Sequence, residues 1–190
     1  TGDAIVDTQT GRQVTIKDLG NDAMCHNDIA LEATESHFSP TSPPPYMAGA
    51  AEIDVDPETG HIELVDFAAV VDCGTVINPA LARVQVEGGL VQGIGMTLTE
   101  DVSMTKDGRI LTNSFMQYRI PTRQDLGRIR VEFAPSYEPN GPFGAKSIGE
   151  IVINTPGPAI AHAVYNAVGI RFTELPITAE KVYMALKHKK

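Results

Sequence analysis

The residues best suited to chemistry in this sequence lie in one short loop, residues 141–150. The loop combines glycines and a lysine with one carboxylate, Glu150, and the apolar residues 151–153 follow directly. A carboxylate beside an apolar wall is either hydrogen-bonded or has a raised pKa, because burial disfavours its charged form. A carboxylate catalyst without a protein-bound metal usually works on a cofactor that other groups hold. Glu150 is therefore the first candidate for a functional side chain.

Other common catalytic and binding patterns are missing from the sequence. Lys146 is followed by Ser147, but the glycines before this pair do not have the GxxxxGK[ST] spacing of a phosphate-binding loop. The five histidines have no spacing typical of a metal site, so no protein metal ligands are expected. The sequence also gives no basis for a Ser-His-Asp arrangement.

Two hairpins and a long helix are expected before this loop. Residues 4–7 and 12–16 predict the first hairpin, and the alternation of residues 51–56, followed by residues 62–71, predicts the second. The second of these strands ends in an apolar run, which indicates burial on both faces. A helix is predicted over residues 80–99.

The other segments are connectors and shorter elements. The Pro- and Ser-rich residues 38–45 predict a rigid extended connector, and residues 29–33 fit either a helical turn or the start of a strand. Further elements are predicted as a hairpin at residues 102–104 and 109–111, a strand at 128–133, a helix at about 158–168, a short strand at 170–175 and a helix from 179 to about 187 capped by Thr178. Hairpins interleaved with separated helices predict the α+β class, with a mixed sheet packed against a few helices.

The long predicted helix contains four glycines, which are unfavourable in a helix interior. Each costs about 1 kcal/mol relative to alanine. Close packing on a sheet or on another helix would explain Gly89 and Gly93, which lie four residues apart on one face. Alternatively, a bulky non-protein group needs the backbone to come close. The sequence leaves both explanations open.

Composition limits the class of protein. A chain of 190 residues with 42% hydrophobic residues can bury one core. Its net charge of −9 argues against nucleic-acid binding, which needs clustered Lys and Arg. Cys25 and Cys73 are too few for a disulfide scaffold, and no apolar run is long enough to span a membrane. We therefore expect a cytoplasmic protein, and the start at Thr1 suggests a processed subunit or a fragment.

Several motifs together resemble one known family. They cover residues 72–79, 85–93, 115–121, 141–150, 163–169 and 175–182. In this order and with these gaps they are similar to the C-terminal part of the molybdenum hydroxylase large subunit, the xanthine dehydrogenase and aldehyde oxidase family. The match runs from about residue 48 to the end. The resemblance therefore implies a molybdopterin-binding region at residues 48–190, preceded by a hairpin and connector at residues 1–47 that belong to a larger domain.

The resemblance also implies a site and a reaction. In this family a pterin dithiolene holds the molybdenum, here in the cytosine dinucleotide form usual in bacterial relatives, and water supplies the oxygen atom. The position of Glu150 in the Gly-Glu motif implies that it is the catalytic general base. The cofactor contacts carry over to two loops and one helix, namely to Cys73, Gly74, Thr75, Asn78, Gln85, Lys146, Ser147 and Gly149.

Three features differ from the family pattern. Val84 replaces a glycine that many relatives have before Gln85, and Ile151 follows Glu150 where proline or serine is common. The family's earlier motifs are absent, so this chain alone should not be a competent enzyme. The implied partners are an N-terminal molybdenum-binding half, an iron–sulfur subunit with 2Fe-2S clusters and an FAD subunit. The expected substrate is a small molecule, either a xanthine-like N-heterocycle or an aldehyde. The alternatives are a carbon monoxide dehydrogenase, an aryl-CoA reductase, or a non-catalytic structural or assembly module.

Overall fold

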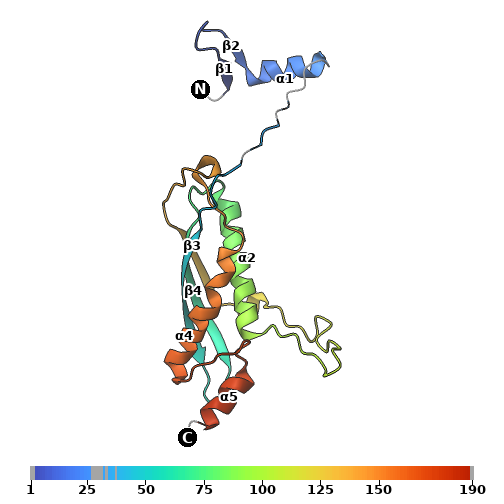
Figure 1. The fold of residues 1–190 in the computed structure, drawn as a ribbon, viewed down its shortest axis with the longest axis vertical. Coiled ribbons are helices and arrows are strands. Elements are labelled where there is room, and N and C mark those ends of the chain that lie inside the picture. Colours follow the sequence, from blue (N-terminus) through green and yellow to red (C-terminus); the bar gives the residue numbers. More distant parts are fainter. Residues whose placement is uncertain (1–2, 27–31, 33, 37, 189–190) are drawn as a thin grey trace. The chain divides into compact units, whose positions relative to one another are not determined.

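The computed structural model of this chain describes residues 3–26, 32, 34–36 and 38–188. The chain divides into two compact units, Thr1–Phe38 and Ser39–Lys190. Figure 1 shows both units, with the helices and strands labelled. Among the described residues, no helix combines the length and the apolar character needed to cross a membrane.

The first unit is a small hairpin followed by a helix. Strand β1 (Ala4–Val6) pairs antiparallel with β2 (Gln13–Thr15), which confirms the hairpin predicted there. Helix α1 (Ile16–Cys25) was not predicted, although Thr15 caps it by accepting a hydrogen bond from the Asp18 N–H at 3.0 Å. The element expected at residues 29–33 lies outside the described residues.

The second unit is built on a three-stranded mixed sheet in the order β3-β4-β5. Strand β3 (Tyr46–Val55) pairs antiparallel with β4 (Ile62–Asp72), and β4 pairs in parallel with β5 (Arg128–Phe133). Exposure alternates along β3, and it also alternates along the apolar end of β4, where Phe67, Ala69 and Val71 are buried but Val70 is 47% exposed. The predicted burial of this strand on both faces is therefore wrong. The second hairpin and the strand after it are nevertheless confirmed, as is the α+β class.

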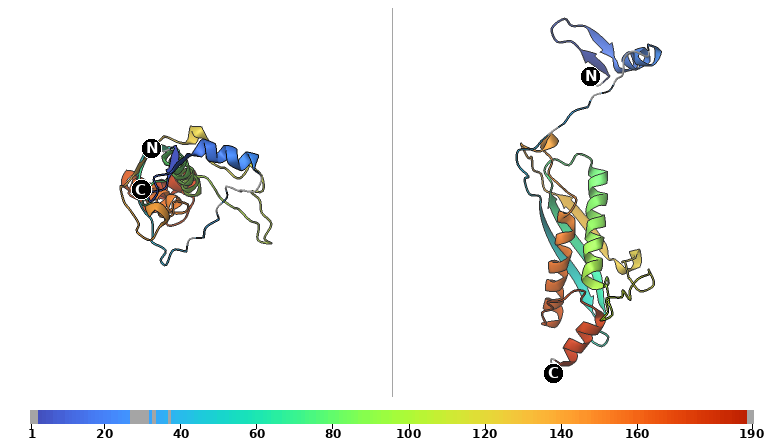
Figure 2. Two further views of the ribbon diagram at one scale, coloured as in Figure 1. Left: turned by 90° about the horizontal axis from the view of Figure 1, so that it is seen from above. Right: turned by 45° about the vertical axis from the view of Figure 1, so that its right-hand side comes forward.

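Helices α2 (Pro79–Leu98) and α4 (Pro156–Val168) run beside the sheet and pack against each other (Figures 1 and 2). Helix α4 also contacts β3, and α2 contacts β5. Side chains from all of these elements form one core, which includes Phe67, Leu90, Val131, Ile160 and Val164. The short helix α3 (Ile151–Asn154) packs on α2 and joins α4 to the loop that ends at Glu150.

Three further predictions need correction or refinement. The apolar residues 151–153 form helix α3, so helical structure starts earlier than the predicted residue 158. The strand predicted at residues 170–175 is wrong: the segment is irregular, and Ile177 beyond it donates its N–H to the Thr97 carbonyl at 2.7 Å. The hairpin at residues 102–111 is reduced to one bridge, between Met104 and Ile110.

The remaining elements are short turns and the last helix. Turns of 3-10 helix occur at η1 (Arg123–Asp125) and η2 (Pro142–Gly144). Helix α5 (Ala179–His188) begins after Thr178, whose hydroxyl accepts a hydrogen bond from the Lys181 N–H at 3.3 Å. The predicted cap of this helix is therefore confirmed.

Candidate cofactor-binding site

Two loops that lie far apart in the sequence are joined along their backbones. The loop after β4 and the loop after η2 form an antiparallel bridge between Gly74 and Ala145. The Thr75 N–H donates to the Gly144 carbonyl at 2.8 Å, and the Lys146 N–H donates to the Cys73 carbonyl at 2.7 Å. The fold thus brings the predicted residues 73–78 next to the predicted residues 146–149.

Gly74 is explained by this close approach. Its φ of +67° is rarely adopted by other residues, and an added Cβ would lie 2.3 Å from the Gly144 carbonyl oxygen. Gly74 therefore allows the two loops to join. It lines neither of the hollows described below.

Asp72, at the end of β4, holds the Lys146 side chain in place. The Lys146 ammonium lies 2.5 Å from Asp72 Oδ2, and the Lys146 side chain is only 9% exposed. The Ser136 hydroxyl also donates to Asp72. The hydrogen bond from Lys146, with that from Ser136, lowers the pKa of Asp72 from 3.8 to about 2. The charge of Lys146 is thus already compensated inside the protein, so its side chain is less available to a ligand than the sequence suggested.

Two further predicted residues, Cys73 and Asn78, have structural roles. Cys73 is 4% exposed, and burial raises the pKa of its thiol, so the thiol stays neutral. Asn78 caps α2, because its Oδ1 accepts a hydrogen bond from the Leu81 N–H at 3.1 Å. This cap fixes the start of the helix that carries Gln85.

Six of the predicted residues line a hollow of about 410 Å³ between the two loops and the first turns of α2, which we call the loop hollow. They are Cys73, Thr75, Asn78, Gln85, Lys146 and Gly149. Apolar side chains, including those of Ile77 and Leu81, complete its wall. Ser147 is exposed and is not part of this lining.

Glu150 lines a second hollow, of about 640 Å³, which we call the carboxylate hollow. Its wall is formed by α2 and α3. Glu150 is exposed, and its side chain has no hydrogen-bond partner among the described residues, so the burial against an apolar wall that the sequence suggested is not found. Gln85 and Gly149 border both hollows, and Gln85 Nε2 donates to the Gly149 carbonyl at 3.3 Å. This contact lies where the loop hollow and the carboxylate hollow adjoin.

Hydrogen-bond donors remain free beside these hollows. Within the described part of the chain, no hydrogen bond uses the backbone N–H of Ser147, Ile148 or Gly149. A glycine-containing loop with such free N–H groups suits anionic or carbonyl oxygens. An added Cβ at Gly88 or Gly149 would meet nothing within 4 Å, so the backbone is open to a bound group here. This donor set fits a polar, anionic cofactor.

The sequence left two explanations for the glycines of α2, close packing and room for a bound group. The structure supports the first for Gly89 and Gly93, whereas Gly88 fits the second. An added Cβ at Gly89 would lie 2.1 Å from Val152 Cγ2, and one at Gly93 would lie 2.8 Å from the Ile153 carbonyl oxygen. These glycines allow α2 and α3 to pack closely. Gly88 has no such neighbour and opens on the carboxylate hollow.

Sequence reasoning missed three residues near the site. Asp72 was noted only as part of a motif, and its ion pair with Lys146 could not be seen from spacing. Gln92 lines the carboxylate hollow, and its position seven residues after Gln85 places both on one face of a helix, which was a usable signal. Asn154 also lines this hollow, but nothing in the sequence marks it.

Comparison with known proteins identifies the family. Residues 1–127, more than half of the chain, match the family described as the molybdopterin cofactor-binding domain. The chain belongs to this family. The resemblance to the molybdenum hydroxylases that the motifs implied is thereby confirmed, and the domain binds molybdopterin in that family.

Individual relatives of this molybdopterin-binding domain are longer proteins. The probable hypoxanthine oxidase XdhD of Escherichia coli K12 is 40% identical over 159 residues, which cover 83% of this chain and 17% of that protein. The 6-hydroxypseudooxynicotine dehydrogenase complex subunit gamma of Paenarthrobacter nicotinovorans is 39% identical over 144 residues, or 73% of this chain and 18% of that protein. The chain thus spans less than one fifth of either relative.

A solved structure shows the same fold. The reconstituted CO dehydrogenase from Oligotropha carboxidovorans matches with a TM-score of 0.82 and 25% identity, over 99% of this chain and 25% of that one. The matched residues include both units of this chain.

Proposed function

We propose that this chain forms the C-terminal part of the molybdopterin-binding large subunit of a molybdenum hydroxylase and supplies its general base, Glu150. The observation that carries the proposal is the position of the Glu150 carboxylate in the carboxylate hollow, next to the Gln85–Gly149 contact that borders the loop hollow. The carboxylate and the cofactor-side loops therefore meet at one place.

The cofactor, when bound, supplies the two-electron redox chemistry. Gln85 would hold a pterin edge, because its amide can both donate and accept hydrogen bonds. The free N–H groups of Ser147, Ile148 and Gly149 would bind its anionic oxygens. We propose the cytosine dinucleotide form, and Cys73, Thr75 and Asn78 would line the cofactor through the loop hollow.

Glu150 would take up the proton that the substrate water loses, at a carboxylate oxygen. The apolar side chains of Val84 and Ile153 lie in the same hollow and would limit access of bulk water once it is filled. General acid–base catalysis of this kind typically contributes ~10²–10⁴ in rate.

The names and lengths of the relatives support a proposal for the substrate and the partners. A xanthine-like N-heterocycle is favoured because the E. coli relative is named a probable hypoxanthine oxidase, and an aldehyde is the other family substrate. Relatives are several times longer than this chain, and one is named as a subunit of a complex, so we propose an N-terminal molybdenum-binding half, a 2Fe-2S subunit and an FAD subunit as partners. We place the assembled enzyme in the cytoplasm.

Carbon monoxide oxidation is the second candidate. It is favoured by the match of 99% of this chain to a CO dehydrogenase. The two candidates are separated by adding CO or hypoxanthine to the assembled enzyme without oxygen and recording which of them bleaches its visible absorption.

The proposal is tested with Glu150→Gln in the assembled enzyme. We expect turnover to fall by about 10²-fold or more, with unchanged molybdenum and pterin content. The matched control is Glu52→Gln, which changes an exposed carboxylate on β3. A Glu150→Gln enzyme with normal turnover would overturn the assignment. Loss of molybdenum together with activity would make Glu150 a cofactor ligand rather than a base.

A further inference from the structure

A long arm, residues 100–121, projects from the end of α2 in the ribbon views (Figures 1 and 2). Its base is fixed to the helix end, because the Tyr118 hydroxyl lies 2.5 Å from Glu100 Oε2 and the Thr99 hydroxyl donates to the Arg119 carbonyl at 2.9 Å. Beyond the base, the arm is held together by its own contacts, such as the bridge between Met104 and Ile110. The base of the arm is therefore held at the end of α2, and the rest of the arm is held mainly by contacts within itself.

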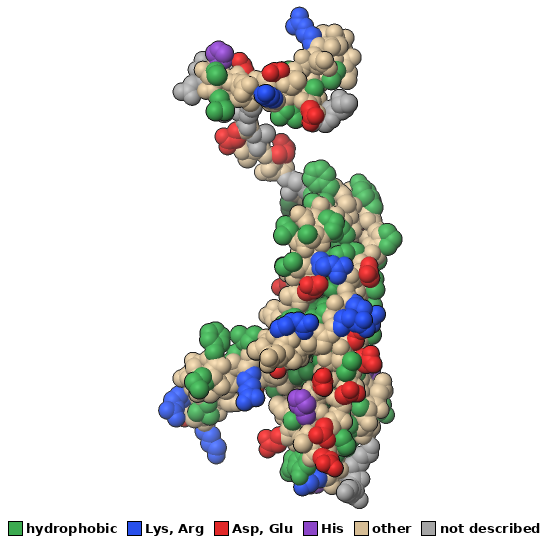
Figure 3. Space-filling model, turned by 180° about the vertical axis from the view of Figure 1, so that it is seen from behind, with side chains coloured by type: hydrophobic (Ala, Val, Ile, Leu, Met, Phe, Trp, Pro, Cys, Tyr) green, Lys and Arg blue, Asp and Glu red, His purple; other side chains and the backbone are tan. Residues whose placement is uncertain are grey.

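Charged residues lie at both ends and at the turn of the arm, but one segment of it is uncharged and exposes large apolar side chains. Phe115 is 85% exposed and Met116 is 89% exposed. Residues 111–117 contain no charged side chain. Other large hydrophobic side chains of the arm are also exposed, namely Val102, Met104, Ile110, Leu111 and Ile120. Figure 3 shows hydrophobic side chains on the arm together with Lys and Arg side chains. Contiguous exposed apolar surface of this kind marks an interaction site.

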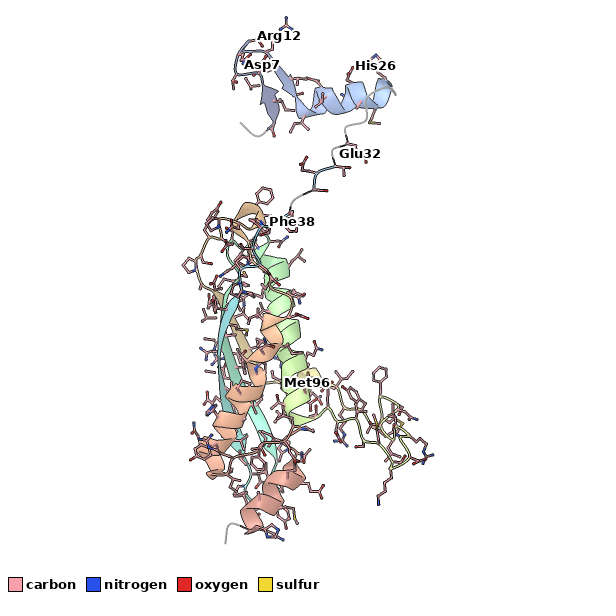
Figure 4. The ribbon with its side chains drawn as sticks, viewed as in Figure 1. Asp7, Arg12, His26, Glu32, Phe38 and Met96 are labelled. Carbon is pink, nitrogen blue, oxygen red and sulfur yellow. The ribbon has the colours of Figure 1, made fainter. Side chains whose placement is uncertain are left out.

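The outward face of α2 has the same character and leads toward the arm. Six of its exposed residues recur every three or four positions and form one uncharged stripe, namely Leu81, Val84, Gln85, Gly88, Gln92 and Met96. The exposed Arg83 lies off this stripe and donates to the Val131 carbonyl at 3.0 Å. Three members of the stripe, Leu81, Val84 and Met96, are large apolar side chains that are 67%, 66% and 49% exposed. Met96, labelled in Figure 4, lies near the end of α2 from which the arm departs.

This stripe also borders the carboxylate hollow through Val84, Gln85, Gly88 and Gln92. A single partner that covers the stripe and the arm would therefore also close the hollow that contains Glu150. We propose that the arm and the α2 stripe form the docking surface for the molybdenum-binding polypeptide that lies outside these 190 residues. This inference rests on the proposed function, since that function requires such a polypeptide.

The length of the relatives and the chemistry of the surface favour this occupant. The matched segment is 17% of the E. coli relative, so most of such a protein is available to cover the surface. Large exposed apolar side chains, such as those of residues 110–116, are typical of permanent interfaces, whereas transient contacts with electron-transfer partners are smaller and more polar. Phe115 and Met116 are the side chains best placed to act as anchors.

The test uses the assembled enzyme with a photo-reactive p-benzoylphenylalanine in place of Phe115. We expect its cross-link, located by mass spectrometry of the digest, in a peptide of the molybdenum-binding polypeptide outside these 190 residues. The same group in place of Met184, an exposed position on α5, is the control and should not give that cross-link. Cross-links from position 115 only to the iron–sulfur or flavin polypeptide, only to a second copy of this segment, or no cross-link at all would overturn the proposal.

A second measurement uses the double variant Phe115→Ser with Met116→Ser, compared with Met184→Ser. Loss of two anchors should lower the yield of assembled enzyme by about 10-fold or more. Equal yields for the double variant and the control would overturn the proposal. Repeating the cross-link in the Glu150→Gln enzyme separates the two claims, because a normal cross-link with normal turnover refutes the base and leaves the docking surface intact.

Discussion

The ion pair between Asp72 and Lys146 gives the sharpest prediction on stability. Replacing Asp72 with Asn leaves the Lys146 ammonium, on a side chain that is 9% exposed, without its counter-charge. The pKa of Asp72 is lowered from 3.8 to about 2, and a shift of this size corresponds to about 2 kcal/mol of folding free energy. Because Asp72 itself is 25% exposed, we expect Asp72→Asn to cost about 2 kcal/mol rather than the ~3–5 kcal/mol of a fully buried pair.

The pH dependence has a definite sign. The pKa of Asp72 is lowered in the folded state, so the pair stabilises the protein above the ordinary pKa of 3.8 and loses its effect as the pH falls toward about 2. The difference in unfolding free energy between the parent and Asp72→Asn should therefore be constant near neutral pH and should shrink below about pH 4. Urea unfolding at pH 7 and at pH 3 measures both values.

A double-mutant cycle assigns this effect to the pair. Lys146→Met should also destabilise, and adding Asp72→Asn to it should cost clearly less than Asp72→Asn alone, with a coupling of about 1–2 kcal/mol. Asp54→Asn, which changes an exposed carboxylate on β3, is the control. A loss below about 0.5 kcal/mol for Asp72→Asn at pH 7, the size of an ordinary surface substitution, would refute the reasoning.

Two further predictions concern helix α2. Gly89→Ala should lower the unfolding free energy by about 1–3 kcal/mol, since its Cβ would clash with the buried Val152, whereas Gly88→Ala should raise it by up to about 1 kcal/mol; equal thermal midpoints for the two variants would contradict this. Gln85→Ala should change the unfolding free energy by less than about 1 kcal/mol, because it removes one exposed hydrogen bond to Gly149, but it should lower the pterin content of the assembled enzyme, measured by fluorescence of the oxidised pterin.

Sequence patterns correctly predicted the elements that turns, helix caps and the periodicity of apolar residues specify. The β3–β4 hairpin combines clean alternation with a turn, and α2 combines a polar cap at Asn78 with a long periodic run. The errors occurred where tertiary contacts decide. Residues 151–153 are β-branched and favour a strand, yet they form α3 because Val152 packs into the gap left by Gly89.

The candidate site was less visible from local patterns. Gln85 and Gly149 are 64 residues apart and meet only in the folded protein. Their selection depended on the family resemblance. Glu150 was a candidate from its own loop, but its role as general base also came from the resemblance. The role of Asp72 could not be predicted, because nothing in the sequence indicates that Lys146 would point back to the end of β4 rather than toward a ligand.

The central claim is that Glu150 acts in the chemical step and not in binding the cofactor. The most direct measurement is rapid mixing of substrate with the assembled, oxidised enzyme without oxygen, following the loss of visible absorption. With Glu150→Gln, reduction by substrate should be about 10²–10⁴-fold slower than with the Glu52→Gln control, while reduction by dithionite stays complete in both. Equal rates of reduction by substrate in the two variants would contradict the account.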